Sequence, residues 1–134
     1  MRQLGRSCTF DPLSDLWLPQ ECTRAYNEEY VNFKDSAPWR YWADEEGNFE
    51  IFNRSSNVDG QHYWSTEEEH IVHCAFMILR FADTLDTGVG FGLDGRKTLT
   101  EHMSHCTKAL LSAALTGNDL HFRNTEPKSG IGRC

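Results

Sequence analysis

The sequence has no long apolar segment, no run of basic residues and no low-complexity stretch. None of its apolar stretches approaches the roughly 18 residues that a membrane span needs. Its 134 residues carry a formal net charge of −7, which argues against a nucleic-acid backbone or an anionic membrane surface as partner. The glycine-rich stretch at residues 87–95 lacks the Gly-Lys-Ser/Thr of a phosphate-binding loop. These absences direct attention to chemistry carried by other side chains.

Apolar residues are also scarce, at 39% of the chain. The length corresponds to one domain, which we expect to span residues 1–134 with an irregular tail over residues 118–134. A core of this size gains from disulfides or a metal, and a second subunit would bury more surface, so we expect a homo-oligomer. No apolar run follows the first charged residues, so no signal peptide is visible.

The five cysteines form two pairs and one odd thiol, an arrangement typical of an oxidising compartment. Cys8 and Cys22 bracket a proline-containing segment, and a bridge between them would close a loop of about 15 residues and contribute about 3 kcal/mol. Cys74 and Cys106 lie in two copies of one motif. Cys134 is the last residue, and we expect it to be free or bonded to another chain.

The local patterns predict a mainly α fold with a small β-hairpin. Prolines at positions 12 and 19 indicate an irregular N-terminal segment, stapled by the Cys8–Cys22 bridge. A short helix is expected within residues 23–33. Strand-forming residues on both sides of Asp-Glu-Glu-Gly-Asn predict the hairpin within residues 39–54.

Two longer helices are expected in the second half of the chain, and each begins with the spacing of a capping box. Ser65 and Glu68 open the first, which should run to about residue 86, where glycines end it. Thr98 and Glu101 open the second, which should run to about residue 115, with Gly117 as its terminator.

Four of the six histidines fall into two copies of the pattern His-x-x-His-Cys. The copies are HIVHC at residues 70–74 and HMSHC at residues 102–106. Residues three apart on a helix point the same way, so each copy presents two imidazoles on one side. If the two helices pack together, four imidazoles meet in one small volume, which suits copper, zinc or nickel. The predicted metal ligands are His70, His73, His102 and His105.

The role of Cys74 and Cys106 stays open at this point. Equivalent positions on two packed helices bring the sulfurs together, either as a disulfide or as thiolate ligands. Two histidines and two cysteines would close a tetrahedral structural zinc site, whereas a disulfide leaves a histidine-only site with an open position. An oxidising compartment favours the second arrangement and copper, with room for dioxygen or substrate.

Residues just before the first motif are further candidates. His62 can supply a fifth nitrogen to the metal. Tyr63 and Trp64 are candidates for lining a pocket that takes an aromatic or apolar substrate.

The chain resembles the UstYa-like proteins of fungal secondary metabolism, which are named for mycotoxin biosynthesis. The resemblance rests on HIVHC and HMSHC and on AFMILR after the first copy, whose last residue, Arg80, matches an arginine of that family. The flanking segments CTFDPLSDLWLPQEC and YWSTEEEHIVHC are similar to the same group, so the resemblance covers roughly residues 7 to 111. It implies metal ligation by the four motif histidines, with Cys74 and Cys106 as their partners, and a contact of Arg80 with substrate.

The same resemblance implies a function and a location. The function is copper-dependent oxidative tailoring of a small molecule or peptide with dioxygen, by cyclisation, hydroxylation, desaturation or halogenation. The location is the secretory lumen or the outside of the cell, for an ectodomain whose N-terminal membrane anchor is missing here. Two alternatives remain: a non-catalytic lumenal domain with a structural zinc or disulfide clasp, and a cofactor-free cyclase that holds its substrate in a reactive shape.

Overall fold

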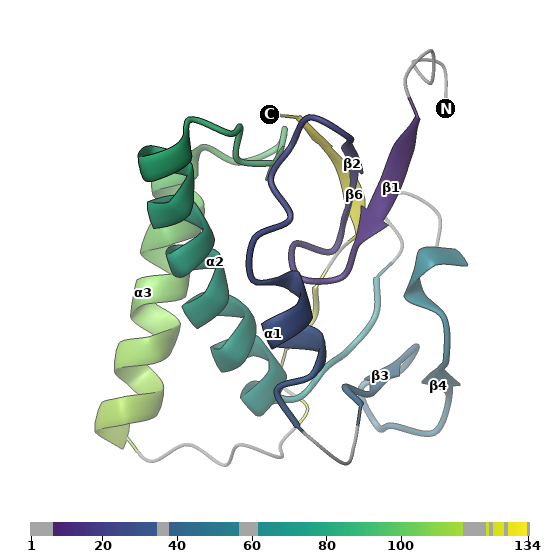
Figure 1. The fold of residues 1–134 in the computed structure, drawn as a ribbon. Coiled ribbons are helices and arrows are strands. Elements are labelled where there is room, and N and C mark those ends of the chain that lie inside the picture. Colours follow the sequence, from purple (N-terminus) through teal and green to yellow (C-terminus); the bar gives the residue numbers. More distant parts are fainter. Residues whose placement is uncertain are drawn as a thin grey trace.

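The computed structural model describes residues 7–34, 38–56, 62–116, 123, 125–127 and 129–133. Within these residues the chain forms three α-helices and two small sheets, of four and two strands. Figure 1 shows the two long helices on one side of the molecule and the strands on the other. The predicted mainly α fold is therefore wrong, because strands make up one side of the domain.

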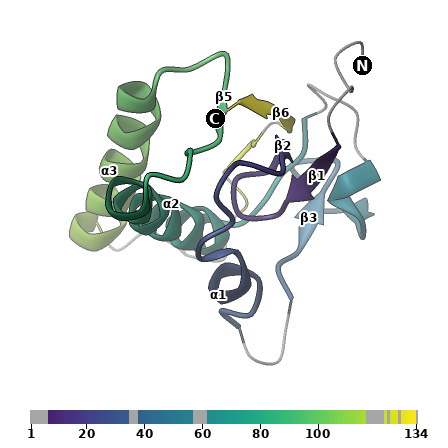
Figure 2. The same cartoon turned by 45° about the horizontal axis from the view of Figure 1, so that its top comes forward.

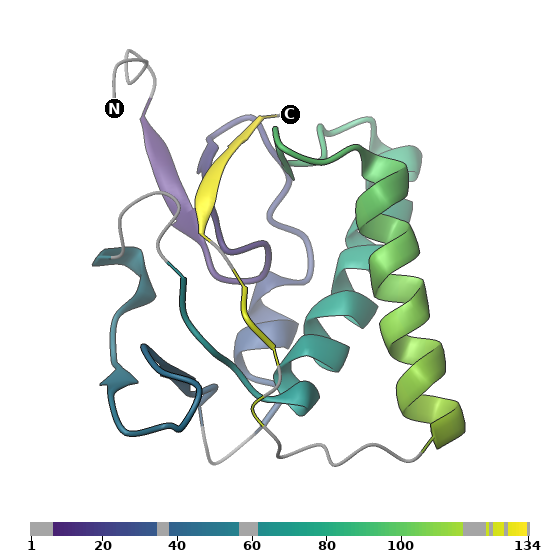
Figure 3. The same cartoon turned by 180° about the vertical axis from the view of Figure 1, so that it is seen from behind.

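The larger sheet has the strand order β1-β2-β6-β5. Its strands are β1 (Cys8–Asp11), β2 (Leu16–Pro19), β6 (Gly130–Arg133) and β5 (Leu93–Asp94). The segment predicted to be irregular is an antiparallel hairpin, and the segment predicted as a tail supplies β6, parallel to β2. Figure 3 shows β6, in yellow, from behind; its neighbours in the sheet are β2 and β5.

Local signals misled the prediction for both segments. Pro12 lies in the turn after β1 and Pro19 at the end of β2, so neither proline interrupts the ladder. Gly132 has a packing reason, because a Cβ there would overlap the side chain of Leu18. This close approach lets a strand with two glycines pack against β2.

The predicted Cys8–Cys22 bridge is not formed. Cys8 is a free thiol, whereas Cys22 is disulfide-bonded. The pairing of β1 with β2 sets Cys8 opposite Pro19, three positions before Cys22, so the hairpin register separates the two cysteines. The prediction for Cys134 lies outside the described residues.

The predicted short helix and small hairpin are both present. They are α1 (Asn27–Val31) and the antiparallel pair β3 (Tyr41–Trp42) and β4 (Glu50–Ile51), followed by the 3-10 helix η1 (Arg54–Ser56).

The long helices are α2 (Glu67–Thr87) and α3 (Leu99–Thr116). The capping box of α3 is confirmed, because Thr98 N–H donates to Glu101 at 2.7 Å and Glu101 N–H donates to the Thr98 hydroxyl at 3.1 Å. The cap of α2 is one residue later than predicted. Thr66 accepts from Glu69 N–H, while Ser65 donates its hydroxyl to the Glu69 carboxylate at 2.7 Å. Gly88, at φ 75°, ends α2 as expected, and Gly117 lies outside the described residues.

The helix α2 lies between α3 and the rest of the domain (Figure 2). It buries Val72 and Met77 against Leu13 and Tyr30, which form the main apolar core. None of the described helices is both long enough and apolar enough to cross a membrane. The packing of α2 on both sides places its motif at the centre of the fold.

Candidate metal centre

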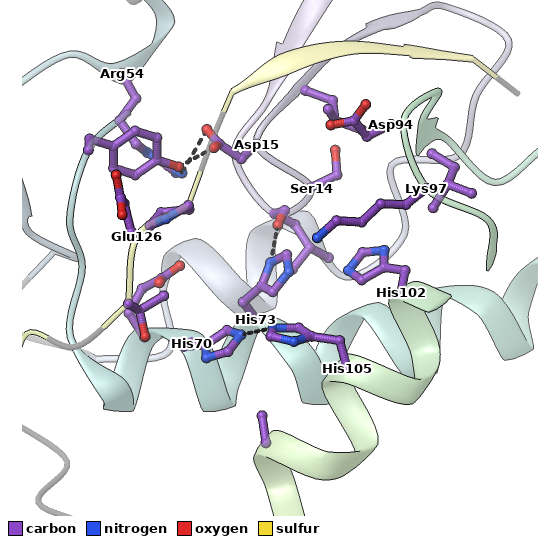
Figure 4. Close-up of a pocket in the computed structure, with 18 of the residues that line it drawn as sticks. Ser14, Asp15, Arg54, His70, His73, Asp94, Lys97, His102, His105 and Glu126 are labelled. Carbon is purple, nitrogen blue, oxygen red and sulfur yellow. Dashed lines mark hydrogen bonds and ion pairs between the residues drawn. The ribbon is translucent and has the colours of Figure 1, made fainter. Parts of the chain in front are cut away.

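All four motif histidines meet between α2 and α3, as the helical spacing predicts (Figure 4). The rings pair crosswise, because the two helices run in opposite directions. His70 Nε2 lies 3.0 Å from His105 Nε2, and the ring centroids of His73 and His102 are 5.9 Å apart. The first histidine of each motif therefore faces the second histidine of the other.

The four rings do not converge on one point. His73, His102 and Cys106 form one group, whose ligand atoms all lie within 4.8 Å of one another. We call these residues the three-residue group, and His70 with His105 the histidine pair. Bonds of about 2.0–2.3 Å to a tetrahedral zinc ion place its ligand atoms roughly 3.3–3.8 Å apart. Small side-chain rotations would bring the three-residue group to that spacing.

The cysteines lie behind the rings. Cys74 and Cys106 are fully buried free thiols, so the disulfide alternative is not the state described here. A hydrogen bond between the two sulfurs lowers the pKa of Cys106 and raises the pKa of Cys74, and a hydrogen bond from His102 also favours the Cys106 thiolate. Since thiolates bind metals, Cys106 is the sulfur suited to ligation.

His73 is held in the tautomer that a metal ligand needs. Its Nδ1–H donates to the backbone carbonyl of Leu13 at 2.6 Å, which leaves the Nε2 lone pair free for a metal. Desolvation lowers the pKa of His73 to about 4, so the ring is neutral at pH 7. Desolvation also lowers the pKa of His105. Neutral imidazole is the form that coordinates metals.

The rings form one wall of a cavity of about 730 Å³. The opposite wall carries Asp15, Arg54 and Tyr63, and the rim near the start of α3 carries Asp94 and Lys97 (Figure 4). A cavity of this size accommodates a drug-sized molecule or a few residues of a peptide.

Asp15 organises the opposite wall. It is 7% exposed and has a left-handed backbone, at φ 59°, which is unusual for a residue other than glycine. Its carboxylate accepts hydrogen bonds from the Tyr63 hydroxyl, from Ser129 at 3.1 Å and from Arg54 at 3.3 Å. Burial raises the pKa of Asp15 to about 6, although the Arg54 charge opposes this.

Sequence reasoning identified Tyr63 in this wall but missed Asp15 and Arg54. Asp15, Arg54 and Ser129 come from three distant segments, and no local motif connects them. The Glu69 carboxylate accepts hydrogen bonds from the Tyr30 hydroxyl and from Ser65, which ties the base of the motif helix to the core.

The accessory candidates have different outcomes. His62 lines the cavity but is exposed and pairs with Glu126 rather than with the other rings. Tyr63 lines the cavity as predicted, whereas Trp64 is outside its lining and pairs through its backbone with Trp42. Arg80 is 1% exposed and binds the Asp11 carboxylate at 2.6 Å, so its predicted place in the pocket is wrong.

The raised pKa of Asp15 predicts a pH-dependent stability. Asp15 binds its proton more tightly in the folded chain than at its ordinary pKa of 3.8. Its contribution is therefore fully present below about pH 4 and is lost as the pH rises through about 6, a change of roughly 3 kcal/mol. The free energies of unfolding of wild type and Asp15→Asn are measured by urea unfolding of chelator-treated protein at pH 4 to 7. Plotted against pH, the two free energies should converge or cross over this range.

Asp94→Asn is the matched control for that experiment. Burial opposes the shift, but hydrogen bonds from Arg96 lower the pKa of Asp94, so its contribution should be lost only as the pH falls below about 4. Wild type and Asp94→Asn should stay nearly parallel from pH 5 to 7. If the free energies of unfolding of wild type and Asp15→Asn stayed parallel between pH 4 and 7, the raised pKa of Asp15 would be contradicted.

No protein-family model, curated protein or solved structure matches this chain. The resemblance to the UstYa-like proteins therefore stays a prediction.

Proposed function

We propose that the protein is a copper-dependent oxidoreductase that tailors a small molecule or peptide in the cavity, with dioxygen as oxidant. One observation carries the proposal: four imidazoles lie in the wall of a cavity of about 730 Å³, and a buried thiol lies behind two of them. The resemblance to proteins of fungal secondary metabolism gives the reaction class, namely cyclisation, hydroxylation, desaturation or halogenation.

The donor set fits copper. His73 and His102 offer two imidazole nitrogens and Cys106 offers one thiolate. Such soft to intermediate ligands bind copper and zinc in preference to harder cations. Three protein ligands leave a position open, as in catalytic metal sites. The histidine pair offers a place for a second ion. A bound copper would supply the one-electron and dioxygen chemistry that side chains lack.

The chain's own residues prepare this site. The Leu13 carbonyl fixes the orientation of His73. The wall of Asp15, Arg54 and Tyr63 is rigid, because its polar groups are hydrogen-bonded to one another. Such a wall holds a substrate in a fixed orientation against the rings.

The disulfide at Cys22 favours an oxidising compartment and thus the proposed secretory or extracellular location. A second candidate function is a non-catalytic domain clasped by structural zinc. Cys74 favours it, because its sulfur adjoins Cys106 and would supply a fourth ligand that closes the site.

Metal reloading separates the candidates. The purified protein is stripped with a chelator, reloaded with Cu²⁺ or Zn²⁺, and assayed for bound metal, for its electron paramagnetic resonance spectrum and for dioxygen uptake with 4-methylcatechol. We expect copper with nitrogen hyperfine structure and dioxygen uptake in the copper form alone. Zinc retained against copper, with no dioxygen uptake, would support the clasp. Turnover by the stripped protein would support the cofactor-free cyclase.

A further inference from the structure

We infer that the cavity takes a substrate bearing a carboxylate, and that Lys97 holds this carboxylate beside the metal ligands. The inference names the substrate class of the site and rests on the proposed function only for what happens to the substrate once it is bound. The steps that carry it are the charge pairing of the cavity wall, the direction of Lys97 and the chemistry of its neighbours.

The other cationic side chains of the cavity wall have acidic partners within the described residues. The pairs are Arg54 with Asp15 at 3.3 Å and Arg96 with Asp94 at 2.6 Å. The pairs neutralise these side chains, so none of them presents a free charge to a ligand.

Lys97 differs from these side chains. In the described part of the chain, its ammonium makes no ion pair and no hydrogen bond. The Lys97 charge acts on Asp94, but that carboxylate is engaged by Arg96, whose Nε and Nη2 lie 2.6–3.0 Å from its oxygens. Lys97 is therefore an exposed cation of the cavity lining that forms no ion pair within the described residues.

The position of Lys97 is fixed by its backbone. Its N–H donates to the Asp94 carbonyl at 3.1 Å, and the next residue, Thr98, caps α3. Figure 4 shows the amine end of Lys97 directed into the cavity, beside His102. The turn and the helix cap together fix the backbone from which the Lys97 side chain extends.

An ammonium next to metal ligands repels a bound cation unless an anion lies between the two charges. A carboxylate interacts favourably with both the ammonium and the metal ion, because it accepts charge-assisted hydrogen bonds from the ammonium and carries the opposite charge to the metal. Leucine, alanine and proline side chains supply apolar lining for the remainder of such a ligand: Leu13, Leu16, Leu93, Ala109 and Pro127. The cavity thus matches a molecule with one carboxylate and an apolar body.

Benzoate and benzamide test the inference, because they have the same shape and differ in charge. Both are titrated into chelator-treated protein, and binding is followed by NMR chemical shifts. We expect benzoate to bind about tenfold more tightly than benzamide, the size of one charge-assisted hydrogen bond. Lys97→Met should remove this preference, and Lys97→Arg should keep it. Lys108→Met is the matched control, since it removes the same charge from an exposed position of α3 outside the cavity lining.

Equal affinity of the two probes for the wild type, no binding of either, or unchanged benzoate affinity in Lys97→Met would overturn the inference. So would tighter binding of inorganic phosphate than of benzoate, because the site would then take another oxyanion. Copper loading is measured separately on the same proteins and should be full in Lys97→Met. A wild type that binds benzoate but no copper would overturn the proposed function and leave the carboxylate site standing.

Discussion

Replacement of His73 by alanine is expected to abolish copper and zinc uptake at the three-residue group. His73 contributes the nitrogen whose tautomer the Leu13 carbonyl fixes, and its ligand atom lies within 4.8 Å of the ligand atoms of His102 and Cys106. Loss of a residue that merely orients a ligand typically weakens metal affinity by about 10- to 100-fold, so loss of the ligand itself should exceed about 100-fold. Competition with a chromophoric chelator measures this change.

Two variants make the result specific. His62→Ala removes an imidazole from the same cavity, but this ring pairs with Glu126, so uptake should stay at the wild-type level. His105→Ala removes one member of the histidine pair and should leave the three-residue group loaded. Full copper in His73→Ala, or loss of copper in His62→Ala, would mean that another set of atoms holds the metal.

The parts of the fold that the sequence predicts correctly depend on short-range interactions. The capping box of Thr98 and Glu101 spans three residues, and the two imidazoles of each motif share a helix face because of the helical repeat. The cap of α2 is one position later than predicted, because the Ser65 hydroxyl donates to the Glu69 carboxylate instead of accepting from the first turn of the helix. Local spacing therefore located the motif helices and the meeting of their rings.

The parts that it misses depend on long-range pairing. The strands β2 and β6 pair Leu16 with Gly130, more than a hundred residues apart, and several strands have only two residues. Such strands carry no periodic signal of their own. The crosswise pairing of the rings likewise follows from the antiparallel direction of α2 and α3, which the spacing within each motif does not specify.

The assignment of Arg80 shows the same limit within one helix. Arg80 lies seven residues after His73, so it points in a similar direction but about 10 Å further along the axis. At that level α2 packs against the N-terminal segment instead of the cavity. Arg80 there donates to the Ala25 carbonyl at 2.7 Å and to both oxygens of Asp11. The resemblance predicted that Arg80 contacts substrate, but Arg80 lies on a part of α2 that does not border the cavity.

Replacement of Arg80 by methionine is expected to cause the largest loss of stability of any single change considered. Asp11 is fully buried, so its carboxylate would lose its countercharge without access to water. Removal of one partner of a buried ion pair typically costs about 3–5 kcal/mol. Urea unfolding at pH 7 measures the loss. Arg40→Met is the control: it removes an exposed arginine paired with Glu50 at 2.8 Å, so its loss of stability should be much smaller.

The pH dependence of this loss identifies its cause. Burial opposes the shift, but the hydrogen bonds and charge of Arg80 lower the pKa of Asp11 in the wild type. The stability that Asp11 contributes is therefore present above its ordinary pKa of 3.8 and lost as the pH falls below it. Without Arg80, burial dominates and favours the protonated carboxyl, so the deficit of Arg80→Met should shrink between pH 7 and pH 4. A variant that unfolds like Arg40→Met, yet no longer binds benzoate, would instead return Arg80 to the cavity as a substrate contact.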